Sequence, residues 1–330
     1  MLNERPKVLV LLSGGLDSTL AVKAMLEQGL EVEAAMFSTP FCLCDKCYAE
    51  SVVKKFGLKA HRIFLGQEYL DLVANPPHGY GSQMNPCIDC RILMMSKAKE
   101  LASEIGAKCL VTGEVLDERP FSQTKRAMDI IEKKTGLEGK ILRPLSAKLL
   151  PETEVEQKGV IDREKLFRIQ GRRRLPQMDL AQEWGIKDYP CPSGGCLLTD
   201  PRFAEKLRDH LKHNETLRTD DVILLRLGRH FRIDGAKFVV GRNKKENERL
   251  LSLAIKRNLL YLEVVEYMGP ITLLERNSPD WLVEKAAQIT VRYSDFKEDT
   301  KIKVKVIDGE NEKIVQTTAA SNQEVEHYRI

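Results

Sequence analysis

The fold is decided by residues 7–19, which read KVLVLLSGGLDST. Lys7–Leu12 is a continuous apolar run of the kind expected for a strand that is buried on both faces. An amphipathic helical pattern follows and ends at Gly29; its apolar stripe is formed by Ala21, Val22, Met25 and Leu26. A tight glycine turn joins the two. This order of strand, turn and helix predicts the start of a parallel α/β sheet.

The same alternation continues along the first half of the chain. Further elements are expected, in the order strand, helix, strand, helix, strand, at 31–37, 50–56, 61–65, 91–105 and 108–114. Such repetition predicts a doubly wound parallel sheet that is covered by helices. After residue 213 the pattern changes to short strands with two helices, which predicts a smaller α+β domain. We therefore expect two domains, residues 1–212 and residues 213–330.

The amino-acid composition indicates a globular protein and argues against a disordered or membrane-spanning one. Of the 330 residues, 42% are hydrophobic and 30% are charged, which is ordinary for a globular protein and argues against disorder. No apolar run approaches the ~20 residues of a membrane span, and the N-terminus lacks a signal-peptide pattern. We expect a cytoplasmic protein with no membrane partner. The net charge of +4 is too small by itself to indicate a polyanionic partner.

The turn after the first strand, Ser13-Gly14-Gly15-Leu16-Asp17-Ser18, has the chemistry of a phosphate site. Two glycines let backbone amides approach an anion, and the helix N-terminus adds unpaired N–H groups. The serine hydroxyls can donate to phosphate oxygens, and Asp17 can hold Mg²⁺. The alternative is a tight turn in which a serine caps the helix. The spacings of the GxGxxG and Walker loops are absent.

The hexapeptide resembles the pyrophosphate-binding loop of the PP-loop superfamily, the N-type ATP pyrophosphatases. Members of that superfamily adenylate a carbonyl oxygen, release pyrophosphate and let a nucleophile displace AMP. The resemblance implies ATP and Mg²⁺ as cofactors, and Asp17 as a catalytic residue. It also implies that Met36 and Phe37, at the end of the second strand, lie against the adenine. The remaining cofactor-binding residues that it implies are Ser13, Gly14, Gly15, Leu16, Ser18, Thr112 and Gly113.

Clustered cysteines are the second unusual feature. The eight are Cys42, Cys44, Cys47, Cys87, Cys90, Cys109, Cys191 and Cys196. In a cytosolic chain, clusters indicate metal binding or thiol chemistry rather than a disulfide framework. Cys109 stands alone in an apolar run, and we expect it to be a small core residue.

Cys87 and Cys90 form a CxxC at the start of the helix expected at 91–105, where a helix dipole lowers the pKa of a thiol. Such a pair can be a redox disulfide, half of a zinc site or part of an iron–sulfur cluster. A structural zinc site would need four ligands, and Cys87, Cys90, Cys191 and Cys196 could supply them.

Together with the loop, these segments resemble the tRNA thiouridine synthetases, over roughly residues 6–200. NPCIDCR (85–91) and SGGCLL (193–198) resemble the segments in which the 2-thiouridylases carry their two catalytic cysteines, which implies Cys90 and Cys196. Thr112-Gly113-Glu114 and Ser122-Gln123-Thr124 look more like the 4-thiouridine synthetases. The resemblance implies ATP-dependent thiolation of a tRNA uridine with release of AMP and pyrophosphate. Whether C2 or C4 of the uridine is thiolated stays open.

Two sulfur-transfer routes fit such an enzyme. In the persulfide route Cys196 carries the sulfur and Cys90 resolves it. In the cluster route Cys87, Cys90 and Cys196 hold a [4Fe–4S] cluster whose fourth iron binds sulfide. Cys87 favours the cluster, because two-cysteine chemistry does not need it. The sulfur donor is either sulfide or a cysteine desulfurase or sulfurtransferase, and a homodimer is left open.

A third cysteine segment, Cys42, Cys44 and Cys47, follows the second expected strand. Ligands bind at the carboxyl edge of open α/β sheets, so this CxCxxC triplet offers a second metal site, for zinc or another cluster. The alternative is a set of free thiols in a loop.

Two features point to RNA. Residues 165–174, KLFRIQGRRR, carry five basic and no acidic side chains, and we expect them to contact phosphates, with a solvated charge run as the alternative. FVVGRNKKEN (238–247) resembles an RNA-binding domain of ribosome quality-control proteins, the alternative being a structural domain that shapes the cleft. The rival functions are a PP-loop sulfurtransferase acting on a small molecule or cofactor, and a non-catalytic RNA- or metal-binding protein.

Overall fold

The computed structural model describes residues 5–42, 46–189, 196–296 and 300–330. Contacts divide the chain into two compact units, Met1–Asp200 and Pro201–Ile330. Each unit has its own sheet and its own hydrophobic core. No helix within the described ranges is long and apolar enough to cross a bilayer.

The first unit is built on a five-stranded sheet whose strands all run parallel. From one edge to the other, the strands are β3 (Lys59–Phe64), β2 (Glu31–Ser38), β1 (Lys7–Leu11), β4 (Leu110–Thr112) and β5 (Ile141–Leu142). β1 is the central strand, and nearly all of it is buried. The predicted parallel sheet is confirmed.

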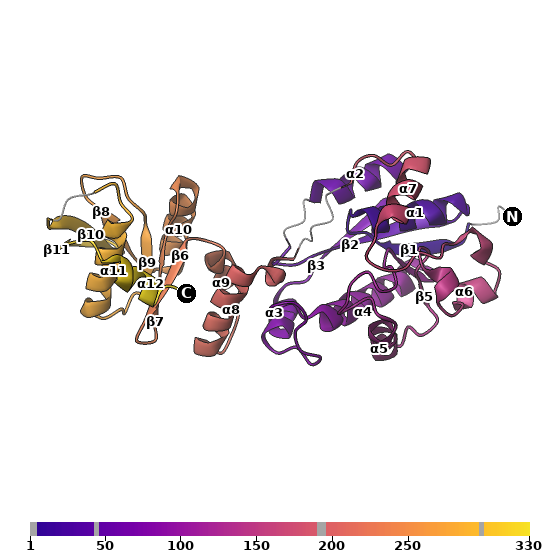
Figure 1. The fold of residues 1–330 in the computed structure, drawn as a ribbon, viewed down its shortest axis with the longest axis horizontal. Helices are drawn as coiled ribbons and strands as arrows, with labels where there is room; N and C mark the ends of the chain where they lie inside the picture. Colours follow the sequence, from indigo (N-terminus) through magenta and orange to yellow (C-terminus); the bar gives the residue numbers. More distant parts are fainter. Residues whose placement is uncertain (1–4, 43–45, 190–195, 297–299) are drawn as a thin grey trace. The chain divides into compact units, whose positions relative to one another are not determined.

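Helices cover both faces of this sheet (Figure 1). Val10 of β1 packs with α1 (Leu16–Glu27) on one face, and Leu9 packs with α4 (Cys87–Ile105) on the other. Successive side chains of a strand point to opposite faces, so a sheet covered on both sides requires an uninterrupted apolar strand. The predicted doubly wound arrangement is therefore confirmed. Cys109, expected in the core, is buried on the α1 face.

The other helices of this unit are α2 (Lys46–Phe56), α3 (Gln67–Ala74), α5 (Lys125–Thr135), α6 (Glu154–Gln157) and α7 (Leu175–Glu183). The helix expected at 50–56 begins earlier, as α2. The sequence pattern did not reveal α3, α5, α6 or α7. Short 3₁₀ turns are η1 (Ala147–Leu149), η2 (Arg163–Lys165) and η3 (Leu197–Thr199).

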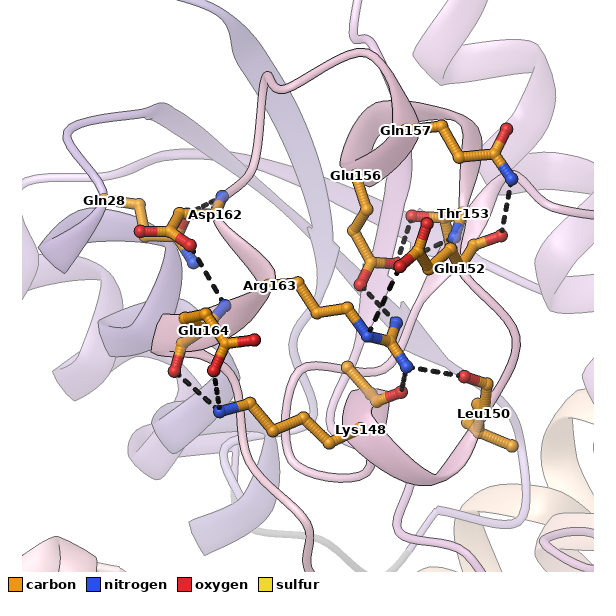
Figure 2. Close-up of polar contacts among 11 residues, drawn as sticks. Gln28, Lys148, Leu150, Glu152, Thr153, Glu156, Gln157, Asp162, Arg163 and Glu164 are labelled. Atoms are coloured by element: carbon orange, nitrogen blue, oxygen red, sulfur yellow. Dashed lines mark hydrogen bonds and ion pairs between the residues drawn. The ribbon is translucent and has the colours of Figure 1, made fainter.

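The connection between β5 and α7 has little regular structure, and side chains hold it in place (Figure 2). Arg163 donates to Glu156 Oε1 at 2.7 Å. The same guanidinium donates to the carbonyls of Ala147 and Leu150 at 2.7 and 2.8 Å. Glu156 also caps α6, because it accepts from the backbone N–H and the hydroxyl of Thr153. This network fixes the path of the chain before it reaches α7.

The second unit contains a six-stranded antiparallel sheet. Its strands, in spatial order, are β11 (Asn311–Thr317), β10 (Ile302–Asp308), β8 (Leu260–Val264), β9 (Thr272–Leu274), β7 (Ala236–Val240) and β6 (Arg229–Ile233). Phe238 of β7 packs with α11 (Asp280–Arg292) on one face, and Val239 packs with α10 (Lys244–Arg257) on the other. The predicted α+β class is confirmed. The unit also contains α8 (Pro201–His213), α9 (Thr219–Leu225) and α12 (Asn322–Tyr328).

The division between the units lies one helix before the expected boundary at residue 213. A boundary at residue 213 would place α8 in the first domain, but its contacts belong to the second. Asp209 of α8 pairs with Arg232 of β6 at 2.6 Å and with Lys237 of β7 at 3.4 Å. A helix at a domain boundary belongs to the domain against which it packs. The sequence pattern shows that α8 is amphipathic but not which domain its apolar side contacts.

Candidate active site

The loop Ser13–Ser18 leaves the carboxyl end of the central strand β1 and enters α1. Gly15 is the N-cap of α1, and no described side chain caps that helix. The hydroxyls of Ser13 and Ser18 lie 3.1 Å apart, and Ser18 also donates to the Gly15 carbonyl at 2.9 Å. A helix start whose N–H groups lack a side-chain acceptor attracts anions. The alternative of a serine cap is therefore not realised, and the loop suits a phosphate group.

Two glycines allow other segments to approach the loop closely. Gly14 has a φ of +81°, and a Cβ on it would lie 2.6 Å from Ala49 N. Gly113, directly after β4, lies so close to the start of α1 that its Cβ would be 2.4 Å from Ser18 N. Gly15 differs, because its φ is −73° and its Cβ would meet its nearest neighbour at 3.4 Å. The packing of the protein thus requires glycine at 14 and 113, but not at 15.

Asp17, in the first turn of α1, pairs with an arginine from far along the chain. Arg174 Nη2 donates to Asp17 Oδ2 at 2.9 Å, and Arg174 Nε lies 3.6 Å from Glu118 Oε1. The other oxygen, Asp17 Oδ1, is buried and has no hydrogen-bond partner among the described residues. Burial raises the pKa of the Asp17 carboxyl, and the Arg174 guanidinium opposes that rise. A buried carboxylate oxygen in this situation fits a bound cation.

The residues expected against the adenine point in different directions. Met36 packs on the α1 face of the sheet and Phe37 on the α4 face. Their contact with an adenine stays a prediction. Thr112 ends β4, and its hydroxyl donates to Glu114 Oε2 at 3.3 Å.

Glu114 links this sheet edge to the cysteine segment, a link that sequence reasoning missed. The carboxylate is buried and pairs with Arg143 at 3.0 Å and with Arg91, the residue after Cys90, at 3.4 Å. Although burial opposes it, these two guanidinium groups lower the pKa of the Glu114 carboxyl. Arg143 is thus part of a buried ion-pair network.

Four cysteines from three segments gather in the first unit. Cys42 and Cys196 face each other in an isolated antiparallel bridge, and Leu197 N donates to the Phe41 carbonyl at 3.0 Å beside it. Burial, together with the neighbouring thiols of Cys90, Cys42 and Cys87, raises the pKa of Cys196 to about 12. The three cysteines of the cluster route thus lie near one another, and Cys42 lies beside them.

Cys87 and Cys90 lie at the start of α4, as expected. The expectation of lowered thiol pKa values is wrong, because burial raises the pKa of both thiols and outweighs the helix N-terminus. The Tyr69 hydroxyl donates to Cys90 Sγ at 3.5 Å. Tyr69 is a neighbour of this cysteine cluster that the sequence pattern did not reveal.

The remaining cysteine predictions are only partly open to comparison with the structure. Cys44 and Cys191 lie outside the described residues, as does the side chain of Cys47. In the described part of the chain, no three His, Cys, Asp or Glu side chains are arranged to hold a metal ion. The structural zinc site and the second metal site therefore stay predictions.

The basic run 165–174 is divided by the structure. Arg172 and Arg173 are exposed, whereas Arg174 is turned inward onto Asp17. Lys165 and Arg168 are exposed as well, so four basic side chains of the run remain available to phosphates, and their contact with RNA stays a prediction.

Comparison with known proteins gives family matches to two stretches of the chain. Residues 4–148 match the family described as thiamine biosynthesis protein (ThiI), and residues 228–329 match the NFACT protein RNA binding domain. The second match covers the VGRN turn (240–243), whose resemblance to an RNA-binding domain is thereby confirmed.

Individual relatives are similar over the first part. A probable tRNA sulfurtransferase of Thermococcus kodakarensis is 30% identical over 142 residues, which are 42% of this chain and 36% of that protein. The tRNA-specific 2-thiouridylase MnmA of Mannheimia succiniciproducens is 29% identical over 140 residues, 38% of this chain and 36% of that protein. The chain thus spans about a third of the length of these curated relatives. The resemblance to the tRNA thiouridine synthetases is confirmed.

A solved structure, a 4-thiouridine synthetase–RNA complex with bound ATP, is similar with a TM-score of 0.37 and 22% identity. The similarity covers 67% of this chain and 52% of that one.

Proposed function

We propose that the protein is an ATP-dependent tRNA sulfurtransferase, which adenylates a uridine carbonyl oxygen and replaces that oxygen with sulfur. The observation that carries the proposal is one unit that holds both an uncapped SGGLDS loop and a group of half-buried cysteines. The first suits a pyrophosphate and the second suits sulfur chemistry. The names of the relatives and the family matches support the same reading.

The reaction divides into two steps. The uridine oxygen attacks the α-phosphorus of ATP, and pyrophosphate leaves into the loop of Ser13–Ser18. Sulfur then attacks the activated carbon, and AMP leaves with the former uridine oxygen. Backbone N–H groups at the start of α1 neutralise charge on the leaving pyrophosphate.

Asp17 is the residue that would hold Mg²⁺. Its unpartnered Oδ1 supplies an oxygen ligand of the kind that this ion prefers. When bound, Mg²⁺ neutralises phosphate charge as pyrophosphate departs. The residue must be ionised for this role, so activity should fall when the pH is lowered through its raised pKa.

Cys87, Cys90 and Cys196 would hold the [4Fe–4S] cluster. Thiolates are the ligands of such clusters, and each binds a different iron, so they need not converge on one ion as zinc would require. When bound, the cluster would supply one open iron for sulfide. Both routes need thiolates, so the raised pKa values of these thiols do not choose between them. The cluster is favoured because a third cysteine, Cys87, lies with Cys90 and Cys196.

tRNA is the proposed partner, since residues 228–329 match an RNA-binding family. Sulfide, or a cysteine desulfurase or sulfurtransferase, is the proposed donor, and the cytoplasm is the proposed location.

Replacing Arg172 and Arg173 together by alanine should weaken tRNA binding. Each lost phosphate contact releases one fewer counterion, so the log–log slope against salt should fall by about 1 per contact. Filter binding from low to high salt measures this slope. Arg174 is kept, because it pairs with Asp17. An unchanged slope would mean that both side chains are only solvated.

The proposed function is tested with anaerobically purified protein, unmodified tRNA, ATP and sulfide. Mass spectrometry of the digested tRNA should detect a thiouridine, with AMP and pyrophosphate formed in equal amounts. ATP–pyrophosphate exchange that needs no RNA would favour a small-molecule substrate instead. Absence of ATP binding would favour the non-catalytic alternative.

A further inference from the structure

We propose that Arg174 is a nucleotide-contacting residue that changes partners: it pairs with Asp17 in the nucleotide-free protein and turns to the phosphates of ATP once Mg²⁺ holds Asp17. The inference rests on the proposed function, because it takes ATP as the occupant of the loop. It adds to the nucleotide site a residue that lies 157 positions after Asp17 in the sequence.

The backbone before and after Arg174 is anchored to the nucleotide side of the sheet. Gln170 forms a parallel bridge with Leu116, a few residues beyond β4, and Gly171 N donates to the Leu116 carbonyl at 2.8 Å. On the other side, α7 begins directly after Arg174, and its Leu180 packs against Leu16 at the start of α1. The arginine backbone is therefore fixed beside the loop, and the long side chain supplies the movement.

The atoms left without partners suggest what the ligand contains. Asp17 Oδ2 is paired with Arg174, whereas the neighbouring Oδ1 is buried without a hydrogen bond. Arg174 Nε is likewise buried and has no hydrogen-bond partner in the described structure. An unpartnered acceptor, Asp17 Oδ1, and an unpartnered donor, Arg174 Nε, thus belong to two side chains that are paired with each other. A magnesium–phosphate unit satisfies both, because it offers a cation to the carboxylate and an oxygen to the guanidinium.

The local charges make the exchange feasible. Two carboxylates, Asp17 and Glu118, face the guanidinium of Arg174, and Glu118 Oε1 lies 3.6 Å from its Nε. Arg119 adds a second positive charge near both carboxylates. When Mg²⁺ takes Asp17, Arg174 therefore keeps a carboxylate nearby and does not become an isolated buried charge. The Arg174 side chain is 17% exposed, so its attraction for phosphate is only weakly screened by solvent.

The variant Arg174→Gln tests whether Arg174 exchanges partners in this way or only forms a structural salt bridge with Asp17. Mn²⁺ is the probe for the cation alone, measured by electron paramagnetic resonance, and Mg²⁺ with α,β-methylene-ATP is the probe for the nucleotide, measured by calorimetry. We expect Mn²⁺ to bind severalfold more tightly, because its competitor for Asp17 is gone. The nucleotide should bind about 10- to 100-fold more weakly, because a charged hydrogen bond to phosphate is lost.

Controls keep the inference falsifiable. Lys187→Gln removes one exposed positive charge from the same unit and should change neither affinity. Arg174→Lys keeps the charge without the planar fork and should restore part of the nucleotide affinity. Unchanged affinities in Arg174→Gln, or a parallel loss of both, would overturn the inference while the wild-type protein still binds nucleotide. Failure of the wild-type protein to bind nucleotide would overturn the proposed function as well.

Discussion

Replacing Asp17 by alanine should abolish pyrophosphate release, lowering the rate at least about a hundredfold. The carboxylate lies in the first turn of α1, one of its oxygens is buried without a partner, and that oxygen is the proposed ligand of Mg²⁺. Without it, charge on the departing pyrophosphate is not neutralised. Single-turnover assays with radiolabelled ATP measure the loss directly.

Binding of tRNA provides the control for this variant. Affinity should stay within a few-fold of the wild-type value, because the metal acts on the nucleotide. Asp17→Asn keeps the shape and should be almost as inactive, which separates the charge from the packing. Wild-type turnover in either variant would remove Asp17 from the mechanism.

Protein purified without oxygen should be brown, with about four irons per chain and an absorption that is lost in air. Alanine at Cys87, Cys90 or Cys196 should remove both the colour and the thiolation, because each would remove one of three ligands. Cys109→Ala should keep both, because Cys109 lies in the hydrophobic core on the α1 face. Iron analysis and the visible spectrum report on the cluster independently of activity.

The persulfide route gives a different pattern in the same variants. Cys87→Ala would stay active, and colourless protein would work once supplied with a sulfurtransferase and cysteine. Full activity of iron-free protein would end the cluster proposal and return Cys90 and Cys196 to persulfide chemistry.

The sheet and the loop could be predicted because their signals are local. The uninterrupted apolar strand 7–12 indicates burial on both faces, and the glycines that follow it mark a strand–turn–helix unit. The same holds for the CxxC at the start of α4, where spacing alone predicts that Cys87 and Cys90 lie together.

The contacts that the sequence did not reveal join distant segments. Asp17 and Arg174 are 157 residues apart, and no spacing rule connects them. The bridge between Cys42 and Cys196 is similarly remote, so Cys42 was grouped with its neighbours in sequence. The predicted direction of the pKa shifts of Cys87 and Cys90 was wrong. The CxxC spacing reveals the helix N-terminus, which lowers a thiol pKa, but not the burial, which raises it by more.

Gly14, Gly15 and Gly113, in or beside the nucleotide loop, would be retained for different reasons. At positions 14 and 113 any side chain would collide with backbone atoms of the protein itself, so purifying selection on folding alone is enough to keep them. At position 15 the backbone conformation and the space would both admit an alanine. Its persistence would therefore have to come from selection on the ligand, and a lineage that lost the chemistry would be free to drift at 15 while 14 and 113 stayed fixed.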